Sequence, residues 1–313
     1  MKFYFFVFTL LFIMGSVTAE CFDLSNLEYN QSQFLNYNRH SGTERNISFI
    51  NESITLCENE YLLKDELIYI NSSDIVFDCD GAIISKIENE WPYRPYFIKF
   101  YGYYGTFDNH ILKNITIQNC IFKNIIISSV SPIHHVTYAH VRQFAYDNIN
   151  FINNTFIYSD EENIGTSLQT VLNFNHIQNS RIENNTFINS GFNFEVGKNL
   201  TLKNNKFTYT NLTTTSYFRN VYLSNVINNV FITNMNFNVV DSNITNNYFY
   251  GFLELIPSCA PPKSLVSFEN NVLRRNLVKP VFFETNIESN IFLWEKYVPS
   301  NPNYVINFDN CYR

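Results

Sequence analysis

Three histidines in one segment are the residues of this chain that most resemble a metal-binding set. His134 and His135 are adjacent, and His140 follows five positions after the second of them. Imidazole is a good ligand for zinc and copper. However, neighbouring residues of an extended segment point to opposite sides, and no cysteine or carboxylate lies close by in the sequence. We therefore expect a polar loop here and no cofactor, and keep these histidines as weak metal candidates.

A cluster of aromatic residues could bind sugar. Trp91, Tyr93 and Tyr96 stand close together, with Arg94 between them. Aromatic rings of this kind present an apolar body with a polar edge, which suits the face of a sugar ring. We regard these four residues as a candidate glycan-binding platform. The alternative is that the rings only pack a loop against the body of the protein.

Carboxylates suited to catalysis do not stand out. Asp160, Glu161 and Glu162 are consecutive, whereas cleavage of a glycosidic bond needs two carboxylates held at a set separation. A solvated charged loop is the simpler interpretation of that run. Asp78 and Asp80 occupy a segment where turn and capping roles suffice, and no Asp or Glu recurs at equivalent positions in successive repeats. We predict no catalytic residue.

The elements that must position these residues are repeats of a short phrase: two asparagines, any residue and a phenylalanine. Successive copies begin between 18 positions (Asn228 to Asn246) and 34 positions (Asn119 to Asn153) apart. A period of roughly 20 with occasional longer steps is the signature of a repeat array. The complete copies begin at Asn153, Asn184, Asn204, Asn228 and Asn246, and degraded copies at Asn119, Asn270 and Ser289.

The phrase predicts a coil of short strands. Asparagine adopts left-handed backbone conformations at low cost, so it can turn the chain sharply between two strands. Flanking segments such as Leu200-Thr201-Leu202 are rich in residues that favour strands. If the coils stack, the asparagines can form a hydrogen-bonded ladder and the phenylalanines can stack inside. A merely biased composition would not place the asparagine pair at regular intervals before an aromatic residue.

These residues resemble the right-handed parallel β-helix of the pectin-lyase-like superfamily. The likeness is closest to the exported repeat proteins grouped with the periplasmic nitrous-oxide-reductase maturation protein, the carbohydrate-binding and sugar-hydrolase repeats. Asp78-Cys79-Asp80-Gly81 resembles a phrase in the first coil of exported members. The likeness covers about residues 54 to 310 and implies an all-β fold, a single right-handed parallel β-helix of about eight coils. It implies no single function, because this fold carries lyases, hydrolases, isomerases, adhesins and spacers.

The unequal repeat lengths predict inserted loops after the strand that carries the phenylalanine. Because the coils stack in register, we expect these loops to project from one edge, which is often the binding face of a repeat array. In the resembled enzymes, loops at this edge overhang the sheet that carries the substrate cleft, so we expect any site there. The insertions fall near residues 85–96, 128–147, 159–168, 209–218, 253–264 and 295–303.

The ends of the chain and its charge predict an exported protein. Residues 1–19 have the positive start, the apolar run and the small-residue cleavage site of a signal peptide, with a membrane anchor as the alternative. After cleavage we expect no membrane span, residues 20–53 as a leader or cap, and residues 54–313 as the β-helix. The net charge is −7 with scattered Lys and Arg. This charge argues against nucleic acid as a partner, and mildly against polyanions.

Six cysteines in an exported chain indicate disulfides. Fifteen connectivities are possible. A buried free thiol is the alternative for Cys120, which occupies an asparagine position of the repeat. Our favoured pairs are Cys57 with Cys79, Cys259 with Cys311, and Cys21 with Cys120.

Asn-x-Ser/Thr sequences are only slightly more frequent than composition alone would give, so they are weak evidence of glycosylation. Asn153 and Asn184 belong to the predicted ladder and should be poor acceptors. The better glycosylation candidates are Asn30, Asn46, Asn51 and Asn211.

Together these features predict a secreted or cell-surface protein that is non-catalytic. We expect it to bind a polysaccharide or surface glycan, or to serve as a structural element of an envelope or adhesive. The alternative is a carbohydrate-active enzyme, a polysaccharide lyase or glycoside hydrolase, with its cleft under the inserted loops. The sequence sets no oligomeric state.

Overall fold

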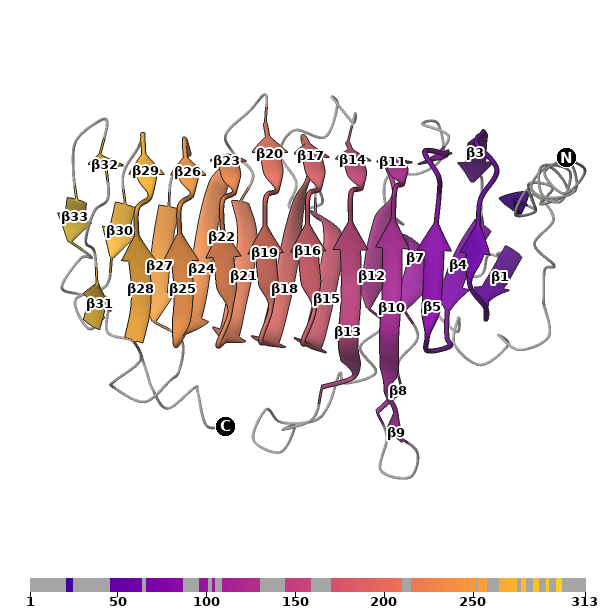
Figure 1. Ribbon diagram of the computed structural model, residues 1–313, viewed down its shortest axis with the longest axis horizontal. Coiled ribbons are helices and arrows are strands. Elements are labelled where there is room, and N and C mark those ends of the chain that lie inside the picture. Colours follow the sequence, from indigo (N-terminus) through magenta and orange to yellow (C-terminus); the bar gives the residue numbers. More distant parts are fainter. Residues whose placement is uncertain are drawn as a thin grey trace, which may run out of the picture.

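The computed structural model shows a single stack of parallel β-coils (Figure 1). Each coil contributes one strand to each of three faces, in the order first, second and third face along the chain. The structure describes residues 21–24, 46–63, 66–86, 96–100, 103–104, 109–129, 144–158, 170–209, 215–251, 253–257, 265–274, 277–279, 284–286, 291–292 and 297–299. In these residues no helix is long and apolar enough to cross a membrane.

The first and second faces form one 21-stranded sheet with parallel pairing throughout. The first face is made of β1 (Asn46–Ile50), β4 (Glu66–Ile70), β7 (Tyr96–Phe100), β12 (Ile126–Ser129), β15 (Thr170–Gln178), β18 (Gly191–Lys198), β21 (Thr215–Tyr222), β24 (Asn234–Val240), β27 (Leu253–Pro257), β30 (Leu277–Lys279) and β33 (Tyr297–Pro299). The second face is made of β2 (Ile54–Thr55), β5 (Ile75–Asp78), β10 (Leu112–Gln118), β13 (Tyr146–Ile152), β16 (Arg181–Glu183), β19 (Thr201–Lys203), β22 (Asn225–Ile227), β25 (Ser242–Thr245), β28 (Leu265–Glu269) and β31 (Glu284–Asn286).

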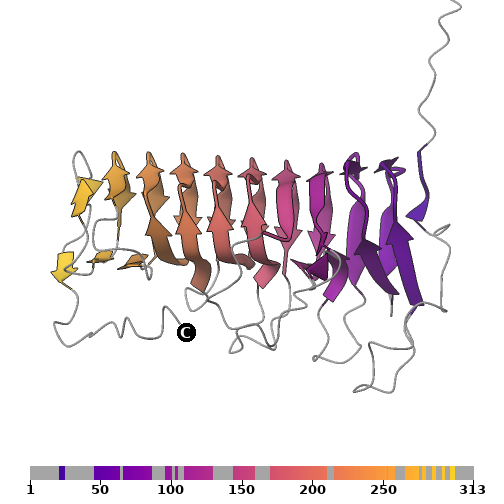
Figure 2. The ribbon, with the colours of Figure 1, turned by 90° about the horizontal axis from the view of Figure 1, so that it is seen from below.

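The third face is a separate ten-stranded parallel sheet, and the coils stand side by side along the rod (Figure 2). Eight of its strands, β11 to β32, follow the eight copies of the repeated phrase, and β3 and β6 precede them. A two-stranded antiparallel hairpin, β8 (Tyr103–Tyr104) with β9 (Asn109–His110), is inserted between β7 and β10. The third-face strands are β3 (Glu60–Leu63), β6 (Ile83–Lys86), β11 (Ile121–Lys123), β14 (Thr155–Ile157), β17 (Thr186–Ile188), β20 (Lys206–Thr208), β23 (Val230–Ile232), β26 (Tyr248–Phe249), β29 (Val272–Leu273) and β32 (Ile291–Phe292).

The architecture confirms the predicted right-handed parallel β-helix, and asparagine makes its corners as expected. The first asparagine of each phrase turns the chain from the second face to the third with φ between 55° and 58°. This left-handed conformation is costly for most side chains and cheap for asparagine. The corner residues are Asn119, Asn153, Asn184, Asn204, Asn228, Asn246 and Asn270.

The second asparagine of each phrase is buried and forms the inner ladder. Between successive rungs the side-chain Nδ2 donates to the Oδ1 of the next coil toward the C-terminus, as Asn185 does to Asn205 at 3.1 Å. The same Oδ1 also accepts the backbone N–H of Asn185, at 3.0 Å. Each amide is thereby fully paired, as burial requires. The rungs are Asn154, Asn185, Asn205, Asn229, Asn247 and Asn271.

The exposed asparagines form outer ladders whose side-chain bonds run in the opposite sense. Asn204 Nδ2 donates to Asn184 Oδ1 at 3.1 Å, toward the N-terminal coil. At the corner between the first and second faces, Asn199 donates to Asn179 in the same sense at 2.9 Å. One residue at that corner breaks the rule, because Leu223 takes the left-handed conformation (φ 53°) that asparagine or aspartate takes in other coils.

Phenylalanine rings fill the interior in columns. The third-face column stacks ring on ring, with centroids 4.3 Å apart between Phe187 and Phe207. In a second column on the first face, Phe194 stacks on Phe174 and meets Phe218 edge to face. Both geometries are favourable for aromatic pairs. The stacked column is Phe122, Phe156, Phe187, Phe207, Phe231 and Phe249.

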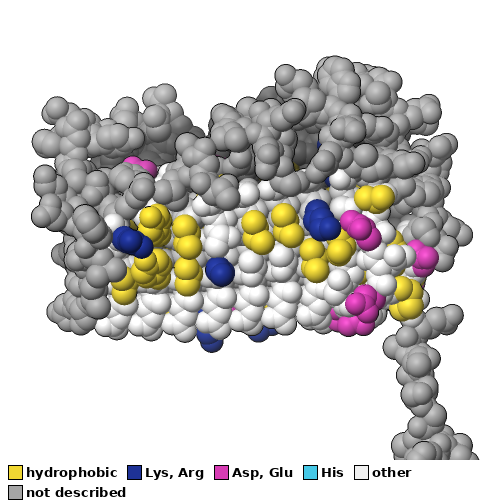
Figure 3. Space-filling model, turned by 90° about the horizontal axis from the view of Figure 1, so that it is seen from above, with side chains coloured by type: hydrophobic (Ala, Val, Ile, Leu, Met, Phe, Trp, Pro, Cys, Tyr) yellow, Lys and Arg dark blue, Asp and Glu magenta, His cyan; other side chains and the backbone are white. Residues whose placement is uncertain are grey.

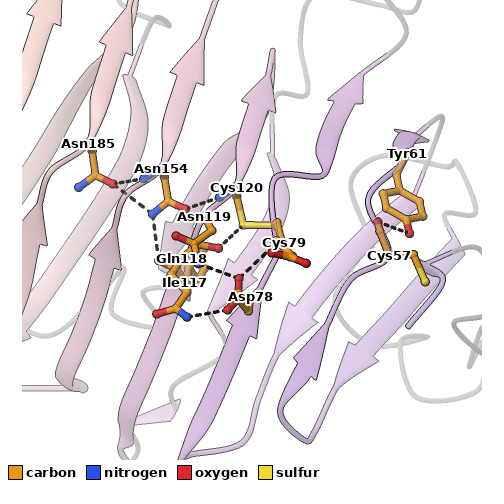
Figure 4. The surroundings of a disulfide bond; sticks show 11 residues. Cys57, Tyr61, Asp78, Cys79, Ile117, Gln118, Asn119, Cys120, Asn154 and Asn185 are labelled. Atoms are coloured by element: carbon orange, nitrogen blue, oxygen red, sulfur yellow. Dashed lines mark hydrogen bonds between the residues drawn. A yellow bond between two sulfur atoms is a disulfide. The ribbon is translucent and has the colours of Figure 1, made fainter. Parts of the chain in front are cut away.

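Two disulfides close the N-terminal end, in pairings that differ from our prediction. Cys21 bonds to Cys57, and Cys79 bonds to Cys120 (Figure 4). The predicted Cys57–Cys79 and Cys21–Cys120 pairs are wrong. Cys79 and Cys120 stack in successive coils, at the position that the ladder asparagines occupy in the later coils. The alternative of a free thiol at Cys120 is wrong for the same reason. Cys259 and Cys311 lie outside the described residues.

A short N-terminal segment packs against the first coil. Residues 21–24 lie against that coil, where Phe22 pairs in parallel with Leu56 and Leu24 is buried. Nearby, Asp78 begins an outer ladder by accepting from Gln118 and Asn119 at 2.7 and 3.0 Å. Burial opposes ionisation of Asp78, but the hydrogen bonds from these residues and from the Asp80 backbone outweigh it and lower its pKa.

The insertions fall at two corners of the coil, not at one edge. The segments between β6 and β7, β14 and β15, and β20 and β21 follow third-face strands, as predicted. The segments between β12 and β13 and between β27 and β28 instead follow first-face strands. The prediction was wrong there because the repeat spacing shows only the strands that carry the asparagine phrase. It does not reveal the first-face strand that lies between the phrase and the insertion. Both sets of insertions flank the first face.

Candidate functional site

Most of the residues singled out from the sequence lie outside the described part of the chain. Tyr96 opens β7 and pairs with Ile126 of β12, which places the end of the aromatic cluster on the first face. The glycosylation candidate Asn51 is exposed, and Asn46 opens β1. Outside the described residues lie Trp91, Tyr93, Arg94, His134, His135, His140, Asp160, Glu161, Glu162, Asn30 and Asn211.

The first face carries the polar surface that best fits a binding site. On β15, β18 and β21 side chains alternate between the buried interior and the outer surface. The outward positions are in register from coil to coil and form two lines, which we call the amide rows. One row is Asn173, Asn193, Tyr217, Asn236 and Glu254, and the other is Asn175, Glu195 and Arg219, followed by Asn238 of β24 where the register shifts.

Contacts within the amide rows hold their side chains in place. Asn193 Nδ2 donates to Asn173 Oδ1 at 3.1 Å. Asn236 Nδ2 donates to Glu254 Oε2 at 2.8 Å. The guanidinium of Arg219 lies 4.0 Å from the centre of the Tyr217 ring, a distance at which a cation is attracted to an aromatic face. The rows therefore combine fixed amides, carboxylates and a ring stacked with a cation.

Three acceptors in the amide rows lack a hydrogen-bond donor. The side-chain oxygens of Asn175, Asn193 and Asn238 are buried and accept no hydrogen bond within the described structure. A buried amide oxygen left unpaired costs about 1–3 kcal/mol. In the inner ladder, by contrast, every rung amide is paired. Because these oxygens are buried, a ligand would meet the other outward groups of the amide rows first.

His176 marks the edge of the amide rows, where the chain bends from the first face to the second. It takes a left-handed conformation (φ 57°), and Asn220 takes the same conformation (φ 51°) on β21. Burial disfavours the charged imidazolium and lowers the pKa of His176. The bend therefore presents a neutral ring beside Asn175 at neutral pH.

The carboxylates of the amide rows do not form a pair suited to glycoside hydrolysis. Glu195 on β18 and Glu254 on β27 are separated by β21 and β24. At about 4.8 Å per strand their positions lie about 14 Å apart along the rod. The paired carboxylates of glycosidases are about 5–9.5 Å apart. Among the described residues no group of three His, Cys, Asp or Glu side chains could hold a metal ion.

The amide rows have a sequence signal that the asparagine phrase concealed. A phenylalanine with polar residues on both sides recurs at Phe174, Phe194, Phe218 and Phe237. The central ring enters the core, so both flanking side chains must point outward in an extended strand. Read as a separate repeat, this pattern would have identified the first face.

Comparisons with known proteins give fold-level likenesses of low similarity. No protein-family model matches the chain, and no curated protein matches it. One similar structure is the Streptococcus pneumoniae surface protein and adhesin PfbA, with 13% identity, a TM-score of 0.33, and coverage of 82% of this chain and 90% of that chain. Another is tailspike protein 3 of bacteriophage CBA120, with 11% identity, a TM-score of 0.27, and coverage of 79% and 48%. At these TM-scores neither likeness bears on ligand or activity.

Proposed function

We propose that this protein is an exported, non-catalytic β-helix protein that binds a glycan along the amide rows of the first face. The observation that carries the proposal is the pair of outward rows of amides, carboxylates and the Tyr217–Arg219 stack on β15, β18 and β21. Outward amides and carboxylates can exchange hydrogen bonds with sugar hydroxyls, while planar amides and a tyrosine ring suit the flat, polar-edged units of a polysaccharide. A polymer can contact several coils at once because the rows repeat with every coil.

Export is supported by the disulfides. Cys21–Cys57 and Cys79–Cys120 join the first coils, and such bonds persist in oxidising compartments outside the cytoplasm. Cys21 is engaged in a disulfide, so the proposed mature protein is not lipidated at this residue. We assign the chain to the exported carbohydrate-binding repeat type on the strength of its asparagine phrase, and place the secreted form at a cell surface or in the medium.

The alternative is a carbohydrate-active enzyme with a cleft under the insertions that flank the first face. The large separation of Glu195 and Glu254 weighs against a two-carboxylate hydrolase built from the amide rows. A purely structural rod without a ligand is the other alternative.

A glycan array with product analysis tests the proposal. The secreted protein should retain at least one polysaccharide and release no shortened or unsaturated product by mass spectrometry. Asn193→Ala should weaken retention about fivefold or more, because it removes an acceptor and the bond to Asn173. Asn225→Ala is the matched control on the second face, where Asn225 accepts from Asn243 in an exposed ladder.

The outcomes separate the three readings. Equal retention by the Asn193 and Asn225 variants would remove the amide rows from the site. New products would make the protein an enzyme, and no retention at all would favour the structural rod. Trp91→Ala, measured in parallel, tests whether the aromatic cluster beside β7 contributes.

A further inference from the structure

The outer surface of the third face differs in composition from the rest of this acidic chain. Between β11 and β29 its strands contain no Asp or Glu, although the whole chain has 28 acidic and 21 basic residues. The outward side chains are aliphatic residues, threonines, two tyrosines and three cations. The space-filling view shows this surface, with hydrophobic and basic side chains over the short strands (Figure 3).

Apolar side chains recur on this surface in most of the described coils, although the outward residues of β20 are Lys206 and Thr208. Each third-face strand buries its central residue and turns its two flanking residues outward. The register is parallel and unbroken from β11 to β29, so outward residues line up along the rod for about 29 Å. The main apolar members are Ile157, Ile188, Val230, Ile232, Tyr250 and Val272, all half-buried.

The cations of this surface are spread along the same line. Lys206 is exposed, and the exposed Arg274 stacks 4.9 Å from the Tyr250 ring centre. Lys123 lies at the N-terminal end, 3.5 Å from Glu60, so its charge is partly balanced. Beyond Glu60, no carboxylate stands on the described strands of this face. The surface is locally positive although the net charge of the chain is −7.

We propose that the third face docks onto an anionic phospholipid surface. Lys206 and Arg274 would meet lipid phosphates, and the aliphatic and tyrosine side chains between them would contact the headgroup boundary. A sugar polymer fits less well, because Ile and Val give its hydroxyls no hydrogen bond. Symmetric pairing with a second copy also fits less well, since the cations of both copies would meet without a carboxylate between them.

This docking is independent of glycan binding, because the amide rows lie on the first face. It would fix the rod parallel to a membrane along a line of several coils. The overall negative charge, which argues against polyanion partners in general, still allows one acid-free face to approach a negative surface when salt screens the rest.

Vesicle sedimentation tests the docking with matched variants. The folded protein should sediment with vesicles of phosphatidylcholine and phosphatidylglycerol, and not with phosphatidylcholine alone, and binding should weaken as salt rises. Lys206→Glu should reduce binding about tenfold, from loss of one cation near the surface and addition of a negative charge. Lys203→Glu is the control, because Lys203 is an exposed lysine of the same coil on the second face.

An apolar pair separates membrane contact from simple charge attraction. Ile232→Ser should reduce vesicle binding about threefold, whereas Ile227→Ser, a half-buried outward residue on the second face of the same coil, should not. Near-ultraviolet circular dichroism of all four variants confirms that they are folded. Equal losses in the paired variants, or no binding to anionic vesicles, would overturn the proposal.

Two other results would overturn the membrane-docking proposal and indicate a different partner for the third face. Retention on an anionic polysaccharide column that is lost with Lys206→Glu but unchanged with Ile232→Ser would indicate a polymer. A concentration-dependent dimer that Ile232→Ser abolishes, without vesicle binding, would indicate a second copy of the chain.

Discussion

The left-handed backbone positions at the corners determine which single substitutions should stabilise or destabilise this protein. Asparagine holds 14 of the 20 non-glycine left-handed positions in the described residues, and the exceptions include two larger apolar side chains, Leu223 (φ 53°) and Val196 (φ 59°). A side chain other than glycine or asparagine in this region costs about 1–2 kcal/mol. Leu223 is also 51% exposed, so burial returns little of that cost.

We expect Leu223→Asn to raise the free energy of unfolding by about 1 kcal/mol. The new amide can also donate to Asn199, as Asn199 does to Asn179. Urea or thermal unfolding measures the change. Tyr222→Asn is the control, because Tyr222 is exposed beside it but has no left-handed backbone, and it should bring no gain. A destabilised Leu223→Asn variant would show that the leucine has a packing role.

His176 should make the fold sensitive to mild acid. Burial lowers its pKa in the folded state, whereas in the unfolded chain the pKa is about 6.5. As the pH falls below that value, the unfolded chain takes up a proton that the folded protein resists, so stability is lost. Asn220 already fills the same bend on β21, so asparagine fits the backbone there.

We therefore expect His176→Asn to lose less stability than the parent protein between neutral pH and about pH 5.5. Thermal midpoints at the two pH values, with both proteins in the same buffers, measure the difference. Identical pH dependence in the two proteins would mean that burial of this ring does not govern the acid response.

At the scale of elements, a disulfide replaces hydrogen bonds where the inner ladder begins. Cys120 stands in the ladder, and its backbone N–H donates to Asn154 Oδ1 at 3.0 Å. Its sulfur bonds to Cys79, one coil back, across 41 residues of chain. Closing a loop of that length stabilises a fold by about 4 kcal/mol in the chain-entropy model.

Double substitution of Cys79 and Cys120 tests whether the disulfide takes the place of ladder hydrogen bonds. Cys79→Ala with Cys120→Ala should lower the free energy of unfolding by about 2–4 kcal/mol. Cys79→Asn with Cys120→Asn should recover part of the loss, because two amides can extend the inner ladder to Asn154. Chemical denaturation of both double variants makes the comparison. An asparagine pair no better than the alanine pair would show that the ladder cannot continue through these coils.

The elements were predictable from sequence where one residue type repeats. The asparagine phrase predicted the third-face strands, the left-handed corners and the phenylalanine column, because each depends on local backbone cost and ring stacking. The cysteine partners were not predictable, since Cys79 and Cys120 become neighbours only through stacking across 41 residues. The amide rows were missed because residue type alone does not distinguish their asparagines from the asparagines of the ladders.

At the scale of the whole molecule, the rod is a one-dimensional array. Each coil contacts only the coils on either side, so local damage should not reach the ends. Asn205 is a sensitive point, because its Oδ1 accepts both the backbone N–H and Nδ2 of Asn185. Removing it leaves the buried backbone N–H of Asn185 unpaired, while Asn185 Nδ2 keeps its bonds to the Phe151 and Glu183 carbonyls.

We expect Asn205→Ala to lower stability by at least about 3 kcal/mol. In hydrogen exchange read by mass spectrometry, protection should fall in the coils of β17, β20 and β23 and remain in those of β5 and β6. Asn204→Ala is the control, because Asn204 is the exposed neighbour at the same corner, and it should cost less. Loss of protection along the whole rod would contradict an array with nearest-neighbour coupling.

The opposed directions of the asparagine ladders have an electrical consequence. Amide groups aligned along an axis add their dipoles, as peptide groups do in an α-helix. Here the inner side chains point their N–H groups toward the C-terminal end, and the outer ones point theirs toward the N-terminal end. The two sets oppose each other, so additional coils add little polarity to the ends of the rod. Repeats could therefore be gained or lost without an electrostatic limit on length.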